Sequence, residues 1–340
     1  MIKPKRLNPG DLISFVSPSS SLSYLFPERI KRAENFFNEL GYPIKIGKTV
    51  NLNYSGKAGT IEERVQDIHD QFTNPEVKAI IATAGGLFAN EIIPHLNYNL
   101  IKQNPKIFCG YSDNTLLSAA FLSQSDLISF YGPCVVTEFG EYPRPFEFTS
   151  KYFLNALNGN LKLLIPSKKG SDDFVDWNKK ENVKRELLPQ PGYVWLNSGK
   201  VKGPLIGGCL PSLRQLAGTK FDFNYAGAIL FLDVPEGEFI GKGLSPNRIE
   251  SLIADFELSG KLEQIRGLMI SRLYRQSKDE ESAILTMFQN KMKKYDIPVV
   301  YGLEMGHRDP QLTVPLGVMT EINSYKNRIC LLESGVINYA

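Results

Sequence analysis

The chain has 340 residues, of which 39 are Lys or Arg and 36 are Asp or Glu, so its formal net charge is only +3. With 42% hydrophobic residues and ordinary numbers of Gly and Pro, the composition excludes a disordered or collagen-like chain. The balance of charge and the lack of a long basic run exclude a typical nucleic-acid-binding protein. The length exceeds the roughly 250–300 residues at which one core stops growing, which predicts two domains.

Targeting signals and paired cysteines are not found. Residues 1–10 are basic but lack an apolar core of signal-peptide length, and no apolar run approaches the roughly 18 residues of a spanning helix. We therefore expect a cytoplasmic protein with no membrane partner. The four cysteines stand singly, without the CxxC spacing of zinc or redox sites, so we expect reduced, mostly buried thiols and no bound metal.

The first half alternates short apolar runs with amphipathic stretches, a pattern typical of βαβ units and a mostly parallel sheet. The predicted strands are 12–16, 44–46, 79–82 and 106–109. The predicted helices are 29–40, 60–72, a segment from about residue 89 that Pro94 ends, and 114–122.

The second half begins after a stretch without periodicity. Residues 167–184 are rich in Lys, Asp, Ser and Gly, which is typical of a linker or a surface excursion. Beyond it the predicted strands are 193–208, 228–233, 267–270 and 299–301, and the predicted helices are 211–216, 249–258 and 283–294.

The three histidines lie in different settings. His69 is in a polar helix, which favours a surface position, and His95 follows Pro94 at a helix end, which favours capping or packing. His307 lies in Gly306-His307-Arg308-Asp309-Pro310, directly after an apolar strand. Loops at strand ends collect catalytic groups in α/β folds, although a structural histidine explains this position equally well.

The strongest local signal is Gly110-Tyr111-Ser112 between a predicted strand and a predicted helix. This is the arrangement of a nucleophile elbow, in which a sharp turn exposes the Ser hydroxyl and the next backbone N–H, here that of Asp113, stabilises an oxyanion. The second glycine of GxSxG is replaced by Asn114. A helix N-cap formed by Ser112 or Asp113 is the alternative explanation.

A second turn, Gly85-Gly86, also joins a strand to a helix. It lacks GxGxxG and the Walker lysine, which weakens a nucleotide-binding interpretation. The backbone N–H of Gly86 is a second candidate oxyanion donor, and tight turning alone explains the glycines about as well.

A histidine base needs an acid that orients it. Asp233 ends the apolar strand 229–232 and is placed to accept from an imidazole N–H. Glu236 and Glu238 follow closely and compete for this role, although exposed loop carboxylates are the simpler explanation of both.

Seven short motifs follow one another along nearly the whole chain: Pro9-Gly10-Asp11, Gly85-Gly86, 104–115, Phe130-Tyr131-Gly132-Pro133, 203–209, 229–233 and 306–317. In this order they resemble the LD-carboxypeptidase family of serine peptidases, which also contains the microcin C self-immunity hydrolases. The resemblance implies that Ser112 is the nucleophile and His307 the general base, with Gly86 and Asp113 as backbone oxyanion donors. It also implies a homodimer without a cofactor or metal.

The resemblance further implies an α/β fold, with a Rossmann-like N-terminal domain that has a parallel sheet and a smaller C-terminal α/β domain. We place the N-terminal domain, with the nucleophile, at 1–165. An inter-domain linker or loop follows at 166–199. The C-terminal domain, with the acid and His307, covers 200–340, and the active site is expected between the domains.

Two departures from the family pattern concern the site. Asp233 stands where the family usually has a Glu, so its side chain is about one methylene shorter; Glu236 is the second choice for the acid. Ala84 stands where the cell-wall branch has an Arg, whereas Asn90 and the Phe130–Pro133 stretch look more like the microcin branch. In that branch a loop Trp stacks on the nucleotide base, which makes Trp177 and Trp195 the candidates here; a core role is the simpler explanation of Trp195.

We therefore predict a serine hydrolase of amide bonds in small peptide-like substrates, similar to an LD-carboxypeptidase, with a Ser112-His307-Asp233 triad. The first alternative is an immunity-type amidase that cleaves acidic aminoacyl-nucleotide analogues, with Asn90 and Trp177 in substrate binding. The second alternative is a binding homologue that has lost activity.

Overall fold

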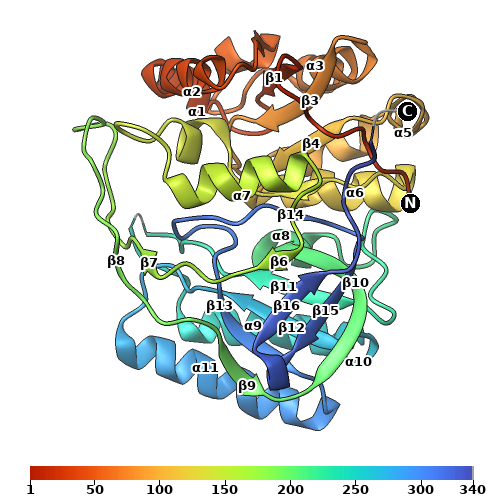
Figure 1. Cartoon of the computed structure of the whole chain (residues 1–340), viewed down its shortest axis with the longest axis vertical. Coiled ribbons are helices and arrows are strands. Elements are labelled where there is room, and N and C mark those ends of the chain that lie inside the picture. The colour runs from red at the N-terminus through yellow and green to blue at the C-terminus, as the bar shows by residue number, and fades with distance from the viewer. Residues whose placement is uncertain (240, 339–340) are drawn as a thin grey trace.

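A computed structural model describes residues 1–239 and 241–338 of the chain, and it contains two α/β units, one above the other in Figure 1. Each unit is built on a sheet that contains parallel strands, so the predicted fold class is confirmed. Among the residues described, no helix has both the length and the apolar character that crossing a membrane requires.

The N-terminal sheet has six strands in the order β14-β5-β4-β3-β1-β2, all parallel except β14. Its strands are β1 (Leu12–Val16), β2 (Ile44–Ile46), β3 (Val77–Ala82), β4 (Ile107–Gly110), β5 (Phe130–Tyr131) and β14 (Val314–Pro315). The helices of this half are α1 (Leu22–Leu25), α2 (Pro27–Glu39), α3 (Ile61–Thr73), α4 (Ala89–Ile92), α5 (Tyr98–Gln103), α6 (Thr115–Ser125) and α7 (Glu147–Leu157).

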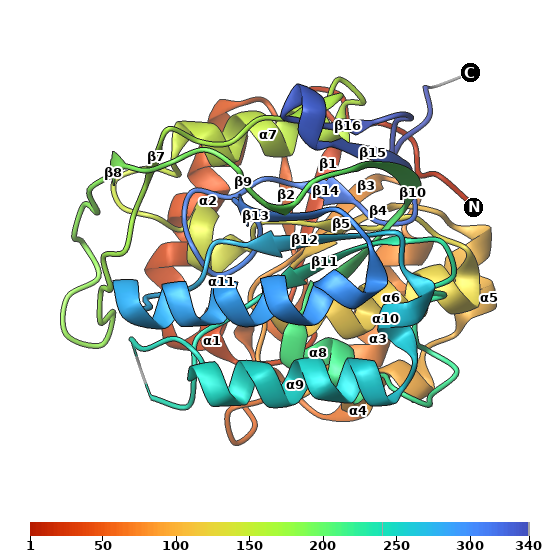
Figure 2. The same ribbon diagram turned by 90° about the horizontal axis from the view of Figure 1, so that it is seen from below.

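The C-terminal sheet has eight strands in the order β6-β16-β15-β10-β11-β12-β13-β9. They are β6 (Leu163–Leu164), β9 (Val194–Asn197), β10 (Lys200–Cys209), β11 (Ile229–Asp233), β12 (Gly267–Ser271), β13 (Val299–Leu303), β15 (Met319–Asn323) and β16 (Arg328–Leu331). The run β10-β11-β12-β13 is parallel. The helices are α8 (Leu210–Gln215), α9 (Pro246–Leu258), α10 (Lys261–Gln264) and α11 (Lys278–Met292), and Figure 2 shows α9 and α11 side by side below the sheet.

Local sequence signals explain where several elements begin and end. Thr60 forms a capping box with Glu63 at the start of α3, and Ser277 does the same with Glu280 at the start of α11. Pro27 and Pro246 occupy the first turns of α2 and α9, where the missing N–H costs no hydrogen bond. The strands predicted at 12–16 and 44–46 match β1 and β2 to the residue.

The two units exchange strands. The two residues of β14, from the second half of the chain, pair with β5, and the two residues of β6, from the first half, pair with β16. The divisions at 165 and 199 stay a prediction.

The segment between the units contains a short two-stranded ladder. Here β7 (Lys169–Gly170) and β8 (Leu188–Pro189) form a two-stranded ladder, and the chain between them extends along one side of both units (Figure 1). We call residues 166–193 the strap. Trp177 packs edge-on against Phe26 of the N-terminal unit, and the N–H of Ser171 donates to the carbonyl of Asp309 in the C-terminal half.

Candidate active site

Ser112 lies at a strained turn between β4 and α6. Its φ is +62°, a left-handed conformation that is unfavourable for a residue with a Cβ and is concentrated at functional sites. The Asn114 side chain donates to the carbonyls of Tyr111, at 2.9 Å, and Ala84, at 3.1 Å. Asn114 therefore stabilises the turn by hydrogen bonding where GxSxG has a second glycine.

Neither Ser112 nor Asp113 caps helix α6. No side-chain cap hydrogen bond is formed at its N-terminus. The Asp113 carboxylate instead accepts from Ser19 Oγ at 2.5 Å and from the N–H groups of Phe88 and Ala89 at 2.9 and 2.8 Å. The alternative explanation of the elbow as a helix cap is therefore wrong. The side chain of Asp113 instead connects the elbow by hydrogen bonds to the segment that follows Gly85-Gly86.

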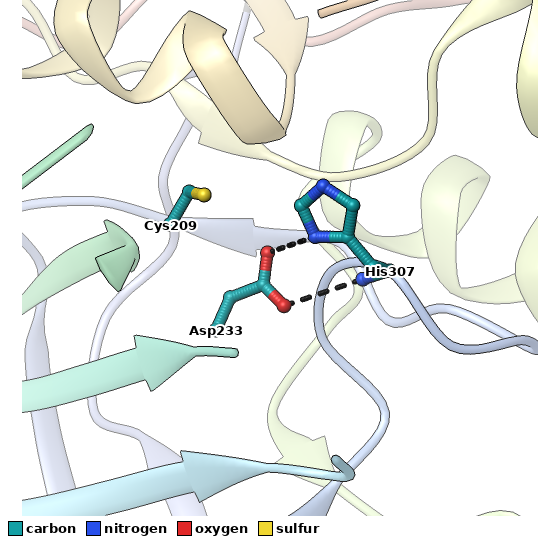
Figure 3. Close-up of side chains that lie close together, drawn as sticks. All are labelled: Cys209, Asp233 and His307. Carbon is teal, nitrogen blue, oxygen red and sulfur yellow. Dashed lines mark hydrogen bonds and ion pairs between the residues drawn. The ribbon is translucent and has the colours of Figure 1, made fainter. Parts of the chain in front are cut away.

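The loop after β13 brings His307 to Ser112. His307 Nε2 lies 2.9 Å from Ser112 Oγ, and His307 Nδ1 lies 2.8 Å from Asp233 Oδ2. The backbone N–H of His307 also donates to Asp233 Oδ1, so the carboxylate holds the residue at two points (Figure 3). Hydroxyl, imidazole and carboxylate thus form one hydrogen-bonded chain, the arrangement of a Ser-His-Asp triad.

Asp233 is buried at the end of β11 and reaches the imidazole in spite of its short side chain. The OH of Tyr131 donates to Asp233 Oδ2 at 2.6 Å and accepts from the N–H of Ser112 at 3.3 Å, so it links the acid to the elbow. Glu236 is exposed at the rim of the cavity described below. The geometry therefore favours Asp233 over Glu236 as the acid.

Gly306 allows the His307 loop to lie close to the carboxylate of Asp233. Its φ is +91°, and a Cβ added to it would lie 1.9 Å from Cγ of Asp233. No side chain fits there without moving the carboxylate or the loop. The backbone of Gly306 thus packs directly on the carboxylate of Asp233, which compensates for the short Asp side chain.

Replacement of Gly306 with alanine should lower the free energy of unfolding by about 3 kcal/mol, because overpacking adds to backbone strain. Gly10 is a matched control: its φ is also +91°, but nothing lies within 4 Å of an added Cβ. Gly10→Ala should therefore cost only about 1 kcal/mol. Urea unfolding of both variants measures the difference, and equal losses would contradict the close packing of Gly306 on Asp233.

Opposing effects act on the pKa of His307. Burial lowers the pKa, whereas the charge and the hydrogen bond of Asp233 raise it, with a smaller contribution from Glu236, and the net result is a raised pKa. Asp233 therefore stabilises the imidazolium that would form when the ring takes a proton from Ser112.

The Gly85-Gly86 turn packs against the elbow. A Cβ on Gly85 would lie 2.7 Å from Cβ of Ser112, and Gly86 has a φ of +147°. Ser20 Oγ donates to the carbonyl of Gly85 at 2.7 Å and fixes the turn. The backbone of Gly86 thus lies in the same cavity wall as Ser112.

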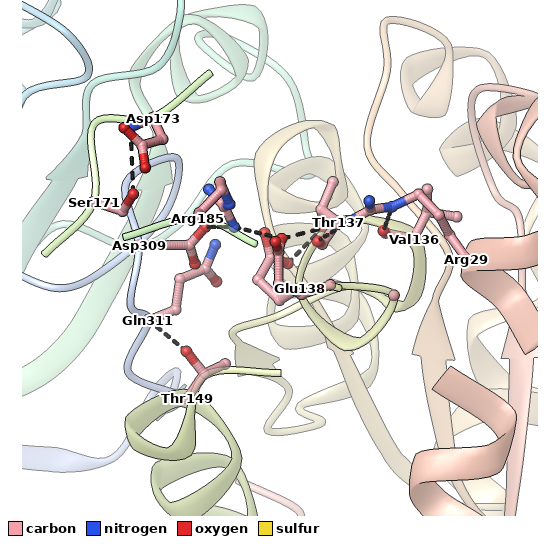
Figure 4. A network of polar contacts seen from close by, with 12 residues as sticks. Arg29, Val136, Thr137, Glu138, Thr149, Ser171, Asp173, Arg185, Asp309 and Gln311 are labelled. Carbon is pink, nitrogen blue, oxygen red and sulfur yellow. Dashed lines mark hydrogen bonds and ion pairs between the residues drawn. The ribbon is translucent and has the colours of Figure 1, made fainter. Parts of the chain in front are cut away.

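A cavity of about 400 Å³ opens at Ser112 and His307, between the two units and under the strap. The polar groups of its wall belong to both units (Figure 4). Arg185 of the strap pairs with Asp309 at 2.6 Å and with Glu141 at 2.7 Å. Glu138 accepts from the N–H of Cys134, and burial together with the charge of Asp309 raises the pKa of Glu138 to about 8.

The two substrate-binding candidates have different positions. Trp177 lines the cavity, and the guanidinium of Arg29 lies 3.9 Å from the centre of its ring. Asn90 is exposed in α4, and the structure does not bring it to the cavity wall. Trp195 lies in β9 and donates to the Asn327 side chain, away from the cavity.

The other two histidines lie outside this site. His69 accepts from the N–H of Asn97 through Nε2 at 2.9 Å, and His95 is exposed in the short helical turn Ile93–His95. Tyr131 is the residue that sequence reasoning missed, because Phe130-Tyr131-Gly132-Pro133 indicated only family likeness and gave the Tyr side chain no role.

Comparison with known proteins identifies the family of the chain. Residues 13–132 match the LD-carboxypeptidase N-terminal domain and residues 202–322 match the LD-carboxypeptidase C-terminal domain. The chain is 30% identical to the microcin C7 self-immunity protein MccF of Escherichia coli, over 95% of this chain and 94% of that protein. It is 27% identical to a probable murein peptide carboxypeptidase of Bacillus subtilis, over 98% of this chain and 95% of that protein. The solved structure of MccF in complex with aspartyl sulfamoyl adenosine superimposes with a TM-score of 0.88 at 27% identity, over 99% of this chain and 100% of that chain. The chain therefore belongs to the LD-carboxypeptidase family of hydrolases.

Proposed function

We propose that the chain is a serine hydrolase of amide bonds in small peptide-like substrates, with Ser112 as nucleophile, His307 as general base and Asp233 as the orienting acid. The observation that carries the proposal is the hydrogen-bonded chain from Ser112 Oγ through His307 to Asp233 at the cavity wall. A cavity between two units suits a short ligand better than a folded protein.

In the proposed reaction, His307 Nε2 takes the Ser112 proton as Oγ attacks the substrate carbonyl. The imidazolium then gives this proton to the leaving amine, and an acyl enzyme remains on Ser112. Water, activated in turn by His307, releases the acid product and restores Ser112. Asp233 holds the neutral ring with its Nδ1 proton directed at the carboxylate and stabilises the imidazolium.

The tetrahedral intermediates carry an oxyanion, which we assign to the backbone N–H groups of Gly86 and Asp113. Two contacts support this assignment. The Gly85-Gly86 turn packs against Ser112, and the Asp113 carboxylate accepts hydrogen bonds from the N–H groups of Phe88 and Ala89 just beyond that turn. Donors held in place before the reaction stabilise developing charge without reorganisation.

The cavity wall holds two guanidinium groups, those of Arg185 and Arg275, among a larger number of carboxylates. Arg185 already has two carboxylate partners, whereas Arg275 contacts the carbonyl of Asp172 and the ring of Phe174. We assign Arg275 to a substrate carboxylate, as a carboxypeptidase requires. The alternative is an immunity-type amidase for acidic aminoacyl-nucleotide analogues, which the position of Trp177 in the cavity wall supports.

Hydrolysis of two substrates tests the proposal. A murein tetrapeptide and aspartyl sulfamoyl adenosine are each incubated with the wild-type protein, and the products are identified by mass spectrometry. Release of a terminal D-amino acid supports the carboxypeptidase, and release of aspartate supports the amidase. If neither is cleaved and a fluorophosphonate does not label Ser112, the non-catalytic alternative replaces the proposal.

Replacing Arg275 with methionine should raise KM for the tetrapeptide about 10–100-fold and change kcat little, because a charge-assisted hydrogen bond to the substrate carboxylate is lost. The wild type should prefer the free acid over the C-terminal amide, and the variant should lose this preference. Arg308→Met is the control, since Arg308 also binds Asp172 of the strap but does not line the cavity. A retained preference in Arg275→Met would contradict the assignment.

The cytoplasmic location and the homodimer that the family resemblance implies are also proposals. Sedimentation equilibrium tests the dimer directly.

A further inference from the structure

A thiol lies beside the Asp233–His307 pair. Cys209 ends β10 and Asp233 ends β11, and the two residues are register partners in neighbouring parallel strands. Their side chains therefore leave the same face of the sheet. Figure 3 shows Cys209 and Asp233 directed toward the imidazole of His307.

The three side chains are a set of zinc ligands. One ligand atom from each of Cys209, Asp233 and His307 lies within 4.8 Å of the others. In a tetrahedral site with Zn–S of about 2.3 Å and Zn–N or Zn–O of about 2.0–2.1 Å, sulfur and nitrogen lie about 3.6 Å apart. The nitrogen and oxygen lie about 3.3 Å apart in such a site. From separations of at most 4.8 Å, the sulfur must thus move in by at most about 1.2 Å. The Nδ1–Oδ2 pair, now 2.8 Å apart, must open by about 0.5 Å.

We propose that Cys209, Asp233 and His307 form an inhibitory binding site for a zinc-like divalent cation, with a water molecule from the cavity as the fourth ligand. Thiolate, imidazole and carboxylate together select such a cation over Mg²⁺ or Ca²⁺, which prefer oxygen ligands. Asp233 is buried, so its attraction to the cation is little screened by water. Burial and the charge of Asp233 raise the pKa of the Cys209 thiol, so the cation must displace the thiol proton.

Bound metal would stop His307 from acting as a base. The cation takes Nδ1, so the neutral ring keeps its single proton on Nε2, which then donates toward Ser112 instead of accepting from it. The Cys209 thiol loses its proton to solvent, and the Nδ1 proton moves to Nε2. Each cation therefore releases one proton, and no oxidation or reduction is involved.

Of the three side chains, the cavity reaches only that of His307. His307 lines the cavity, whereas Cys209 and Asp233 are not part of its wall. A cation that enters the cavity thus meets the imidazole first, and the ring would have to rotate for the cation to reach the carboxylate and the sulfur. Exposed Glu236 at the rim adds negative charge along this path.

Cobalt binding tests the site without any substrate, so this arm is independent of the proposed function. The wild type should bind about one Co²⁺ with the near-ultraviolet charge-transfer band of a cobalt thiolate. Cys209→Ser should lose this band, and Cys330→Ser, a variant of the buried cysteine on β16, should keep it. The proposal is overturned if the wild type shows no thiolate band or if Cys209→Ser retains it.

Inhibition is the second arm, and it rests on the proposed function. Zn²⁺ should slow fluorophosphonate labelling of Ser112 at least tenfold in the wild type, and EDTA should restore the rate. Each variant is compared with its own metal-free rate, and Cys209→Ser should require at least tenfold more Zn²⁺. Cobalt binding without slower labelling would overturn the inhibitory role, whereas no labelling even without metal would count against the proposed function.

Discussion

Replacing Ser112 with alanine should lower kcat for amide hydrolysis by roughly 10⁴–10⁶-fold, because the attacking atom is lost and only binding and oxyanion stabilisation remain. The variant should still bind substrate, since Oγ forms new bonds only during the reaction. Steady-state kinetics measure kcat, and mass spectrometry after fluorophosphonate treatment should show one adduct on the wild type and none on the variant.

The fold should tolerate this change. Ala has the same Cβ as Ser, so the strained φ of +62° is neither relieved nor made worse. Thermal unfolding should therefore give similar Tm values. Ser123→Ala, in helix α6 that follows the elbow and away from the cavity wall, should keep its activity. A Ser112→Ala variant that retains more than a few per cent of the wild-type kcat would show that another residue is the nucleophile.

Replacing Asp233 with asparagine should lower kcat by roughly 10³–10⁴-fold, because the amide no longer holds the ring tautomer that accepts the Ser112 proton. The pH profile should change as well. His307 must be neutral to act as a base, so activity falls as pH decreases through its raised pKa. Removal of the Asp233 charge lowers this pKa, and the acid limb of kcat/KM should move to lower pH.

Glu236→Gln is the matched control for the acid. Glu236 is exposed and contributes less than Asp233 to the raised pKa of His307. The control should therefore lose much less activity, about tenfold at most, and shift the acid limb only slightly. A larger loss in Glu236→Gln than in Asp233→Asn would reverse the assignment of the acid.

The sequence determined the local elements and the type of chemistry. Short apolar runs around 12–16 and 44–46 specify strands of a parallel sheet, because neighbouring residues already show the necessary pattern. Gly110-Tyr111-Ser112 between a strand and a helix predicts an elbow, and the order of seven motifs identified the family. Each of these predictions needs only a few consecutive residues or, for the family, the order of short motifs along the chain.

Only the tertiary structure decided which distant residues meet. Ser112 and His307 are separated by 195 positions, and their hydrogen bond depends on how two sheets pack. The choice of Asp233 over Glu236 follows from the end of β11 lying under Gly306, a contact that no spacing reveals. Tyr131 links the acid to the elbow, Asn90 lies outside the cavity wall, and residues 171–178 and Arg185 of the strap line the cavity. Such contacts arise from packing between remote segments, whereas periodicity and propensity describe only neighbours along the chain.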